Sequence, residues 1–214
     1  CFLEENYDLN CTLEELSGER DLNYLVREKS GELFVLKISN SSESLDFMNV
    51  QNDALERVSK LIEKGSFPEV CPNIKGESLT SIISPKGDTH LMRLVRYIKG
   101  LPMAEYKPHN KEFLSELGIM CGTITDALKN ISSNPPKRKL LWEMHDVKNT
   151  LNEYIPCIKD KKLQKCVRQS LVVFCNSLSS LEKKLRRGWI HNDFNDYNIL
   201  VVPSLVGSPN FGLI

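Results

Sequence analysis

The sequence predicts an α+β fold with two lobes, a small antiparallel β lobe over residues 1–98 and a mainly helical lobe over residues 99–214. The β lobe is indicated by short apolar runs, rich in β-branched residues, that alternate with turns containing Gly or Pro. The helical lobe is indicated by apolar residues that recur at helical spacing from Lys107 onward. A polar loop at 189–198 then leads into the β-branched run 199–202, which is typical of a strand.

The β lobe is predicted to contain two hairpins and one helix. Residues 1–16 are expected to form a short helix or its remnant, and a polar turn at 17–23 leads into the first hairpin. Gly, Pro, Asn and Asp gather in the connections, where such residues favour turns. The expected elements are strands at 24–26 and 33–38 around the turn 30–32, a helix at 45–64, and strands at 79–83 and 89–97 around the turn 84–88.

The second lobe is predicted to contain three amphipathic helices, at 110–128, 140–155 and 161–185. Asn110 is the expected N-cap of the first of these helices. Trp142 either lines an acceptor pocket or belongs to the core, as a Trp on an apolar helix face usually does. The final run 211–214 is predicted to be a strand.

The polar loop is the strongest candidate for a functional site. It contains His191, Asp193 and Asn198, and four residues separate the Asp from the Asn, as in the catalytic loop of protein kinases. Phosphoryl transfer needs these two residue types together, a carboxylate to orient the nucleophile and a neutral oxygen ligand for Mg²⁺. The alternative is a turn that is simply rich in its usual residues.

The amino-acid sequence of the loop resembles that of a particular group of small-molecule kinases. Asn192 replaces the Arg of protein kinases, and Asn195 follows two positions after Asp193. The loop resembles the H-G-D-x-H-x-x-N pattern of the aminoglycoside phosphotransferase and choline kinase superfamily, with Asn in place of the Gly and of the second His. Within that superfamily, it is most similar to the hydroxylysine kinase branch. The implied fold is protein-kinase-like.

The resemblance implies a role for each residue of the loop. Asp193 would be the catalytic residue that accepts the proton of the attacking hydroxyl, and Asn198 would hold Mg²⁺. His191 would brace the loop by hydrogen bonding, and Asn195 would lie on the substrate side with it.

Lys37 is the expected phosphate-binding lysine of the β lobe. It lies in Phe34-Val35-Leu36-Lys37-Ile38, which resembles the V-A-I-K strand of kinases and implies contacts with the nucleotide phosphates. The alternative is a solvent-facing lysine on an amphipathic strand. Its partner from the following helix would be Gln51 by position in the superfamily, or Glu56 because it carries the charge.

Two further segments are implied to bind the nucleotide. Ser17, in the turn with Gly18 and Asn23, would lie over the phosphates as a weak counterpart of the kinase Gly-rich loop. Residues 94–97 would form the hinge that meets the purine edge, with Val95 and Tyr97 in contact, and the Gly-x-Pro at 100–102 resembles the end of that hinge. An edge strand followed by a loop is equally compatible with this segment.

The implied activity is transfer of the γ-phosphoryl group of GTP or ATP to a hydroxyl of a small amine, amino alcohol or amino acid. In the most similar branch the acceptor is 5-hydroxy-L-lysine and the donor is GTP. The alternatives are a truncated protein or pseudokinase that binds nucleotide without catalysis, and a kinase domain joined to an aminotransferase.

Composition excludes no globular class but favours a small-molecule partner. Lys plus Arg equals Asp plus Glu at 28 each, so bulk charge indicates no nucleic-acid partner. No apolar run approaches the roughly 18 residues of a membrane span, which predicts no membrane partner. Seven cysteines lie without metal-ligand spacing, which favours free thiols and a cytoplasmic location.

Both ends suggest a C-terminally truncated fragment. The chain opens on Cys1 and closes on an apolar strand-like run. We expect an Asp-Phe-Gly-like metal-binding segment immediately after Ile214, so the fragment alone is expected to be inactive.

Overall fold

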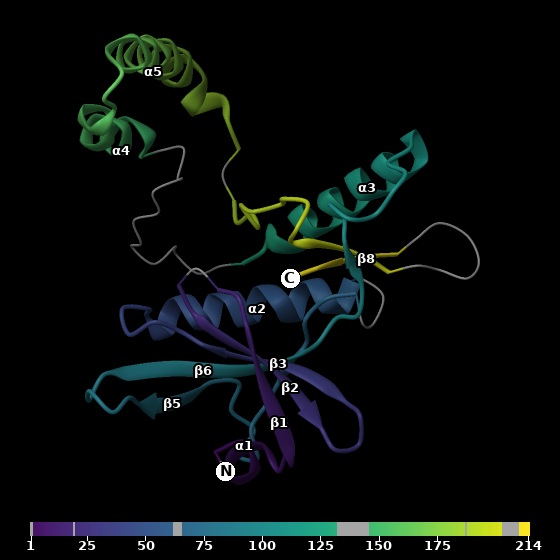
Figure 1. Ribbon diagram of the computed structural model, residues 1–214. Coiled ribbons are helices and arrows are strands. Elements are labelled where there is room, and N and C mark those ends of the chain that lie inside the picture. Colours follow the sequence, from purple (N-terminus) through teal and green to yellow (C-terminus); the bar gives the residue numbers. More distant parts are fainter. Residues whose placement is uncertain (1, 19, 62–65, 132–145, 187, 203–209) are drawn as a thin grey trace. The chain divides into compact units, whose positions relative to one another are not determined.

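A computed structural model describes most of the chain (Figure 1). The described residues are 2–18, 20–61, 66–131, 146–186, 188–202 and 210–214. The chain divides into two compact units, one formed by 1–134 together with 189–214 and the other by 135–188. The predicted lobe boundary at residue 98 falls inside the first unit and stays a prediction.

The first unit is built on a six-stranded antiparallel sheet. The main path runs β1-β2-β3-β6-β4, and β5 pairs with β6 beside it. The strands are β1 (Cys11–Leu16), β2 (Leu22–Glu28), β3 (Leu33–Ile38), β4 (Val70–Cys71), β5 (Thr80–Ile83) and β6 (Thr89–Arg96). Both predicted hairpins, β2–β3 and β5–β6, are confirmed.

The prediction of a helix over residues 1–16 is correct only for its first half. Helix α1 covers Phe2–Tyr7, whereas Cys11–Leu16 forms strand β1. Strand β1 pairs with β2 from Cys11 opposite Glu28 to Leu16 opposite Asn23. Its side chains are mostly exposed, so no alternation of apolar and polar residues marks it in the sequence. Backbone pairing with a neighbouring strand decides its structure.

The two faces of this sheet have different partners. Phe34 and Leu36 of β3 point to one face, where they form a core with Leu94 of β6 and with Leu3 and Tyr7 of α1. Because side chains alternate along a strand, Lys37 lies on the opposite face. Helix α2 (Leu45–Leu61) lies along that opposite face, on the other side of the sheet from α1 (Figure 1).

Helix α2 confirms the helix predicted from residue 45. The Ser44 hydroxyl oxygen accepts a hydrogen bond from the Phe47 amide (3.2 Å), which satisfies one of the free N–H groups at the helix start. Its buried residues are Met48, Val50, Asn52 and Val58. The predicted end at residue 64 lies outside the described residues.

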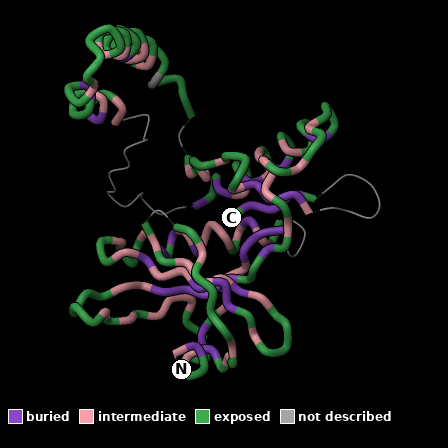
Figure 2. Tube along the Cα trace, in the orientation of Figure 1, coloured by how far each residue is buried: buried purple, intermediate pink, exposed green. Residues whose placement is uncertain are grey.

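A second core lies around a three-stranded sheet. The strands β7 (Leu101–Pro102), β8 (Ile199–Val202) and β9 (Asn210–Leu213) are antiparallel in that order. Helix α3 (Lys111–Leu128) contributes Phe113, Met120, Ile124 and Leu128 to the same core as these strands. The Asn110 side chain accepts a hydrogen bond from the Phe113 amide (2.8 Å), so the predicted cap is confirmed. Figure 2 shows the buried residues gathered in the strands of both sheets.

The second unit is helical. It contains α4 (Val147–Tyr154), the 3₁₀ turn Ile155–Cys157, α5 (Lys161–Leu181) and the 3₁₀ turn Glu182–Lys184. The Gln164 side-chain amide donates to the Ile155 carbonyl (3.0 Å), which joins α5 to the turn before it. Residues 140–145, with Trp142, lie outside the described residues. No helix in the described parts of the chain is both long and apolar enough to cross a membrane.

Candidate active site

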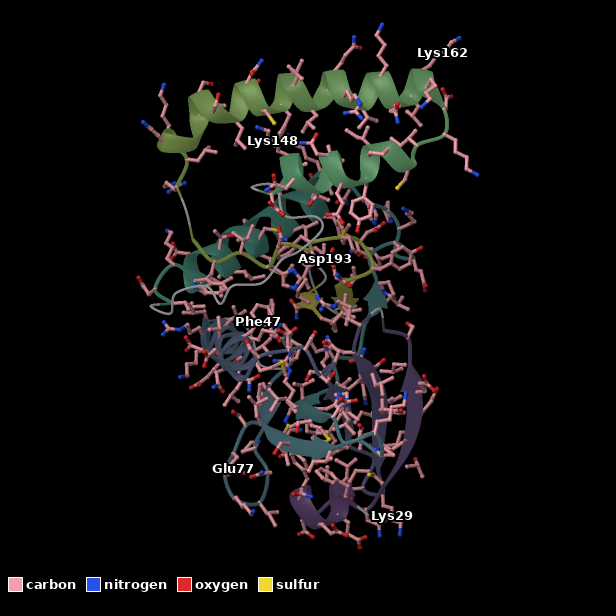
Figure 3. The ribbon with its side chains drawn as sticks, turned by 90° about the vertical axis from the view of Figure 1, so that its left-hand side faces the viewer. Lys29, Phe47, Glu77, Lys148, Lys162 and Asp193 are labelled. Carbon is pink, nitrogen blue, oxygen red and sulfur yellow. The ribbon has the colours of Figure 1, made fainter. Side chains whose placement is uncertain are left out.

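The Asp193 carboxylate is held by two asparagine side chains of its own loop. Oδ1 accepts a hydrogen bond from the Asn195 amide and Oδ2 from the Asn198 amide, both at 2.8 Å. Asp193 is nevertheless exposed, on the loop beside the short strands of the second sheet (Figure 3). The carboxylate therefore has a fixed orientation and stays accessible from outside the loop.

Asn195 also shapes the backbone that follows. Its Oδ1 accepts hydrogen bonds from the amides of Tyr197 (2.9 Å) and Asn198 (3.1 Å). This is an Asx-type turn, in which an Asn side chain takes the place of a backbone carbonyl. One side chain thus orients Asp193 and fixes the turn that presents Asn198.

Asn192 has a backbone conformation that explains the residue types at this position. Its φ is +66°, in the left-handed region that Gly adopts freely and Asn tolerates better than other residues. The Gly of the H-G-D pattern and the Asn found here satisfy the same backbone requirement.

His191 contacts its own loop at two points. Its Nδ1 accepts a hydrogen bond from the Asp193 amide (3.3 Å), and its ring lies edge-on to Phe194, 5.1 Å between centroids. Burial lowers the pKa of His191, with a smaller contribution from Lys37, while Asp193 acts in the opposite direction. The neutral ring is the form that this hydrogen bond requires, since a protonated Nδ1 has no lone pair.

Backbone hydrogen bonds anchor the loop to the second sheet. The Met103 amide donates to the Ile199 carbonyl (2.8 Å), and the Ala104 amide donates to the Asp196 carbonyl (3.0 Å). The Ile214 amide donates to the Asn198 carbonyl (3.0 Å). The loop therefore rests on strands that belong to a buried core, which is how a precise site is kept rigid.

A cavity of about 450 Å³ brings together most of the predicted nucleotide-binding residues. Lys37 and Val95 come from the β lobe, Ser17 from the β1–β2 turn, Tyr97 from the segment after β6, and Asn198 from the loop. A neighbouring cavity of about 670 Å³ lies over the catalytic loop and shares Ser17, Tyr197 and Asn198 with the first. Its lining is Ser17, Gly18, Asp193, Asn195, Asp196, Tyr197 and Asn198.

The β1–β2 turn approaches its own chain closely at Gly18. A Cβ placed on Gly18 would lie 2.4 Å from the Asp21 carbonyl oxygen and 2.6 Å from the Asn23 side-chain nitrogen. Only a glycine fits there without displacing backbone. The turn thereby stays folded against β2, with Ser17 on the wall of both cavities.

Lys37 has the electrostatic setting of a ligand-binding lysine. It is half-buried on the wall of the smaller cavity. Burial and, to a smaller extent, the positive charge of Arg93 lower the pKa of Lys37 to about 8, although Asp21 acts in the opposite direction. An ammonium in such a position gains stability from a bound anion.

The predicted pairing of Lys37 with Gln51 or Glu56 differs from the observed contacts. The Gln51 side-chain oxygen accepts a hydrogen bond from Arg93 Nη2 (2.8 Å). Glu56 is exposed and forms an ion pair with Lys60 one turn along the helix (2.6 Å). Arg93 was not among the predicted site residues. The sequence signal for it is a charged residue inside an apolar strand, and the register places it directly opposite Lys37.

The segment predicted as the hinge lines the cavity, but its amides are partly engaged. The Tyr97 amide donates to the Leu33 carbonyl (3.1 Å), and the Arg96 amide donates to the Glu69 carbonyl (2.9 Å). Val95 lies within the β3–β6 ladder opposite Val35, and both side chains reach the cavity. The amide of Tyr97 is thus already used within the protein, and its predicted contact with a purine stays a prediction. Tyr197 and Leu200, absent from the prediction, line the same cavity.

The loop fits an oxygen-binding divalent cation such as Mg²⁺. Both contacts from the Asn198 amide nitrogen go to Asp193, at 2.8 Å to Oδ2 and 3.0 Å to the carbonyl oxygen, so Oδ1 is what Asn198 retains for a metal. No cluster of three or more His, Cys, Asp or Glu side chains suited to a metal occurs in the described part of the chain. Mg²⁺ is usually bound by one or two protein oxygens together with waters and substrate phosphates, and the Asn198 oxygen would be one of them.

The chain belongs to the APH phosphotransferase enzyme family, whose model matches residues 12–208. The matched residues include the strand with Lys37 and the whole polar loop with Asp193 and Asn198.

Two relatives are hydroxylysine kinases. The one from Bos taurus is 28% identical over 182 residues, which are 79% of this chain and 46% of the relative. The one from Danio rerio is 26% identical over 192 residues, covering 86% of this chain and 53% of the relative. The chain thus spans about half the length of the curated relatives it matches.

Two solved kinases have the same fold. A microcompartment-associated aminopropanol kinase matches with a TM-score of 0.68 at 16% identity, covering 99% of this chain and 66% of that one. The amicoumacin kinase hAmiN, solved with AMP-PNP, Ca²⁺ and Ami, matches with a TM-score of 0.57 at 17% identity, covering 89% and 52%. The fold is therefore kinase-like α+β, as predicted.

Proposed function

We propose that this chain is the nucleotide-binding and catalytic part of a kinase that transfers the γ-phosphoryl group of GTP or ATP to a hydroxyl of an amino acid or amino alcohol, with 5-hydroxy-L-lysine as the first acceptor to test. The observation that carries the proposal is the Asp193 carboxylate, oriented by Asn195 and Asn198 at 2.8 Å each and exposed on a cavity that adjoins Lys37.

The proposed division of labour follows from the contacts. Lys37 binds the phosphates, because its half-buried ammonium lines the cavity and a bound anion offsets the charge that burial disfavours. Asp193 accepts the proton of the acceptor hydroxyl as its oxygen attacks the γ-phosphorus and the bond to the nucleotide diphosphate breaks. Asn198 Oδ1 would hold Mg²⁺, which when bound offsets the negative charge of the phosphates.

The choice of acceptor is supported by what the relatives phosphorylate. The curated relatives are named for hydroxylysine, and a structural neighbour for aminopropanol, both of which carry a hydroxyl and an amine. The residues that line the cavity are compatible with both GTP and ATP. Both nucleotides present the same triphosphate to Lys37 and Ser17.

A second candidate is a protein that binds nucleotide without phosphoryl transfer. It is favoured by one observation: the contacts of the Asn198 amide nitrogen leave that residue one oxygen for a metal, whereas kinases use an Asp in addition to the Asn. In line with this, we propose that the 214 residues alone bind nucleotide but do not transfer its phosphoryl group to an acceptor. The relatives, of which the chain spans about half, are longer.

We also propose a reducing compartment such as the cytoplasm. The cysteines within the described residues carry free thiols. Free thiols persist where glutathione and thioredoxin keep them reduced.

The test is phosphoryl transfer by the full-length product of the reading frame, with GTP and ATP each offered against 5-hydroxy-L-lysine and a panel of amino alcohols. Asp193→Asn is the active-site variant. Asp88→Asn, in the exposed β5–β6 turn, is the matched control. Turnover with the control and its loss in Asp193→Asn support the kinase. Nucleotide binding without turnover on any acceptor supports the second candidate.

A further inference from the structure

Arg93 is a buried cation whose partners are two neutral amides. Its exposed fraction is 8%, and its guanidinium donates to Asn52 Oδ1 from Nη1 and to Gln51 Oε1 from Nη2, each at 2.8 Å. Its Nε has no hydrogen-bond partner within the described structure. Burying a charge without a carboxylate partner is costly, so such an arrangement calls for a functional reason.

The position of Arg93 relates it directly to the phosphate-side lysine. Strands β3 and β6 pair so that Arg93 stands opposite Lys37, with both side chains on the face that α2 covers. In protein kinases the equivalent lysine forms an ion pair with a Glu of the helix, and this pair sets the active position of both. Here the helix residue that reaches the sheet is Gln51, and its side-chain oxygen accepts a hydrogen bond from Arg93.

We propose that Arg93 is a positioning residue for nucleotide binding. It holds α2 to the sheet through the side chains of Gln51 and Asn52, and it leaves the Lys37 ammonium without a helix partner, available to the nucleotide phosphates. The inference rests on the proposed function of Lys37 and deepens it, by replacing the lysine–glutamate pair of kinases with an arginine–amide pair.

The surrounding charges agree with this role. Arg93 lowers the pKa of Lys37, in addition to the larger effect of burial, and Asp21 opposes both effects. Burial lowers the pKa of Arg93 itself to about 10, with Asp21 again opposing. Lys37 also lowers the pKa of His191. Two neighbouring cations with one nearby carboxylate form a site that an added anion stabilises.

The decisive experiment is a double-mutant cycle between Arg93 and Gln51, read out by the dissociation constants of GTP and ATP with Mg²⁺. Arg93→Met should weaken binding about tenfold or more, the usual cost of losing a charged hydrogen-bonding partner. Gln51→Glu alone should have little effect, because Arg93 captures the new carboxylate. In the Arg93→Met background, Gln51→Glu should restore binding, because the introduced carboxylate can now pair with Lys37 as in kinases.

A pH series supplies a readout that a purely structural role would not change. In the parent chain, affinity should fall as the pH rises through the Lys37 pKa of about 8. In Arg93→Met this fall should move to higher pH, since one neighbouring positive charge is gone. Arg93→Lys keeps the charge but loses the hydrogen bonds to two amides. Its affinity should therefore fall over the same pH range as that of the parent. This variant keeps the test valid if Arg93→Met folds poorly.

The controls separate failure of this inference from failure of the proposed function. Arg27→Met removes an exposed arginine of the same sheet, paired with Glu14, and should bind like the parent. If neither the parent nor Arg27→Met binds nucleotide, the proposed function fails. If both bind and Lys37→Met does not, the function stands. The role of Arg93 alone would then be overturned by either of two results. One is an Arg93→Met variant that binds nucleotide as tightly as the parent, and the other is a Gln51→Glu change that has the same effect on binding in both backgrounds.

Discussion

The Asn198 side-chain nitrogen donates to both the carboxylate and the carbonyl of Asp193, at 2.8 and 3.0 Å. The carboxylate that we propose as the proton acceptor and the amide that we propose as the metal ligand are thus hydrogen-bonded to each other within the loop itself. A preorganised pair needs no rearrangement as charge develops during phosphoryl transfer. The same contact uses the amide nitrogen of Asn198 and leaves its oxygen available for the Mg²⁺ that we propose.

Asn195→Ala should lower kcat by about 10- to 100-fold, the range expected when a catalytic group loses its orientation. The substitution removes the hydrogen bond to Asp193 Oδ1 and both backbone contacts of the turn. Steady-state kinetics of the full-length protein measures it. Asn195→His, which restores the residue of the superfamily pattern and can still donate to Asp193, should retain more activity. Equal losses in both variants would contradict an orienting role.

Asn192→Val should strain the loop by about 1–2 kcal/mol, because a β-branched residue is forced into the left-handed region. Asn192→Gly, at the same φ of +66°, should be tolerated. Chemical denaturation gives the change in unfolding free energy, and kcat shows whether Asp193 moves with the backbone. A valine variant as stable and active as the glycine variant would show that the loop does not need this conformation.

The sequence was sufficient for the elements and residues whose signal is local. The hairpins and the cap at Asn110 each depend on neighbouring residues, and each is found as predicted. The roles of Asp193 and Asn198 stay predictions. Strand β1 was missed because its side chains are exposed on both faces, so that only its pairing with β2 marks it.

The contacts of Lys37 depend on information that is not local. Gln51 and Arg93 are separated by 42 positions, and their pairing follows from how α2 lies on the sheet. A sequence position alone places Gln51 near the lysine without showing which cation it meets. For the same reason Tyr197 and Leu200 become cavity residues only once β8 is placed beside β7.

Gly18→Ala should weaken nucleotide binding, because its new Cβ would lie 2.4 Å from the Asp21 carbonyl oxygen and push the turn away from β2. Ser17 would then leave the wall of both cavities. Gly118→Ala is the matched control, since nothing lies within 4 Å of a Cβ at that position of helix α3. The control should raise stability by roughly 0.5–1 kcal/mol, the usual gain from replacing a helical glycine. Titration with nucleotide and thermal unfolding measure the two effects, and normal binding by Gly18→Ala would show that the turn takes no part.

Nucleotide affinity should fall as the pH rises above about 8, the lowered pKa of Lys37. The sign follows from the charge. The phosphates bind the ammonium form, which the folded protein loses at a lower pH than an ordinary lysine does, so affinity drops up to about tenfold per pH unit beyond that point. The effect on stability has the opposite direction. Between about 8 and 10.5 the unfolded chain holds the proton more strongly, so the cost of burying the charged lysine is relieved as the pH rises.

Lys37→Arg is the matched control for this pH dependence, because arginine keeps its charge throughout the range. Its affinity should be lower than that of the parent near neutral pH, since the guanidinium differs in shape, but it should stay nearly constant from about pH 7 to about pH 10. Isothermal titration with GTP and ATP at each pH measures both chains. A parent affinity as flat as that of the arginine variant would mean that Lys37 does not bind the phosphates as a cation. A parallel fall in both would assign the pH dependence to another group.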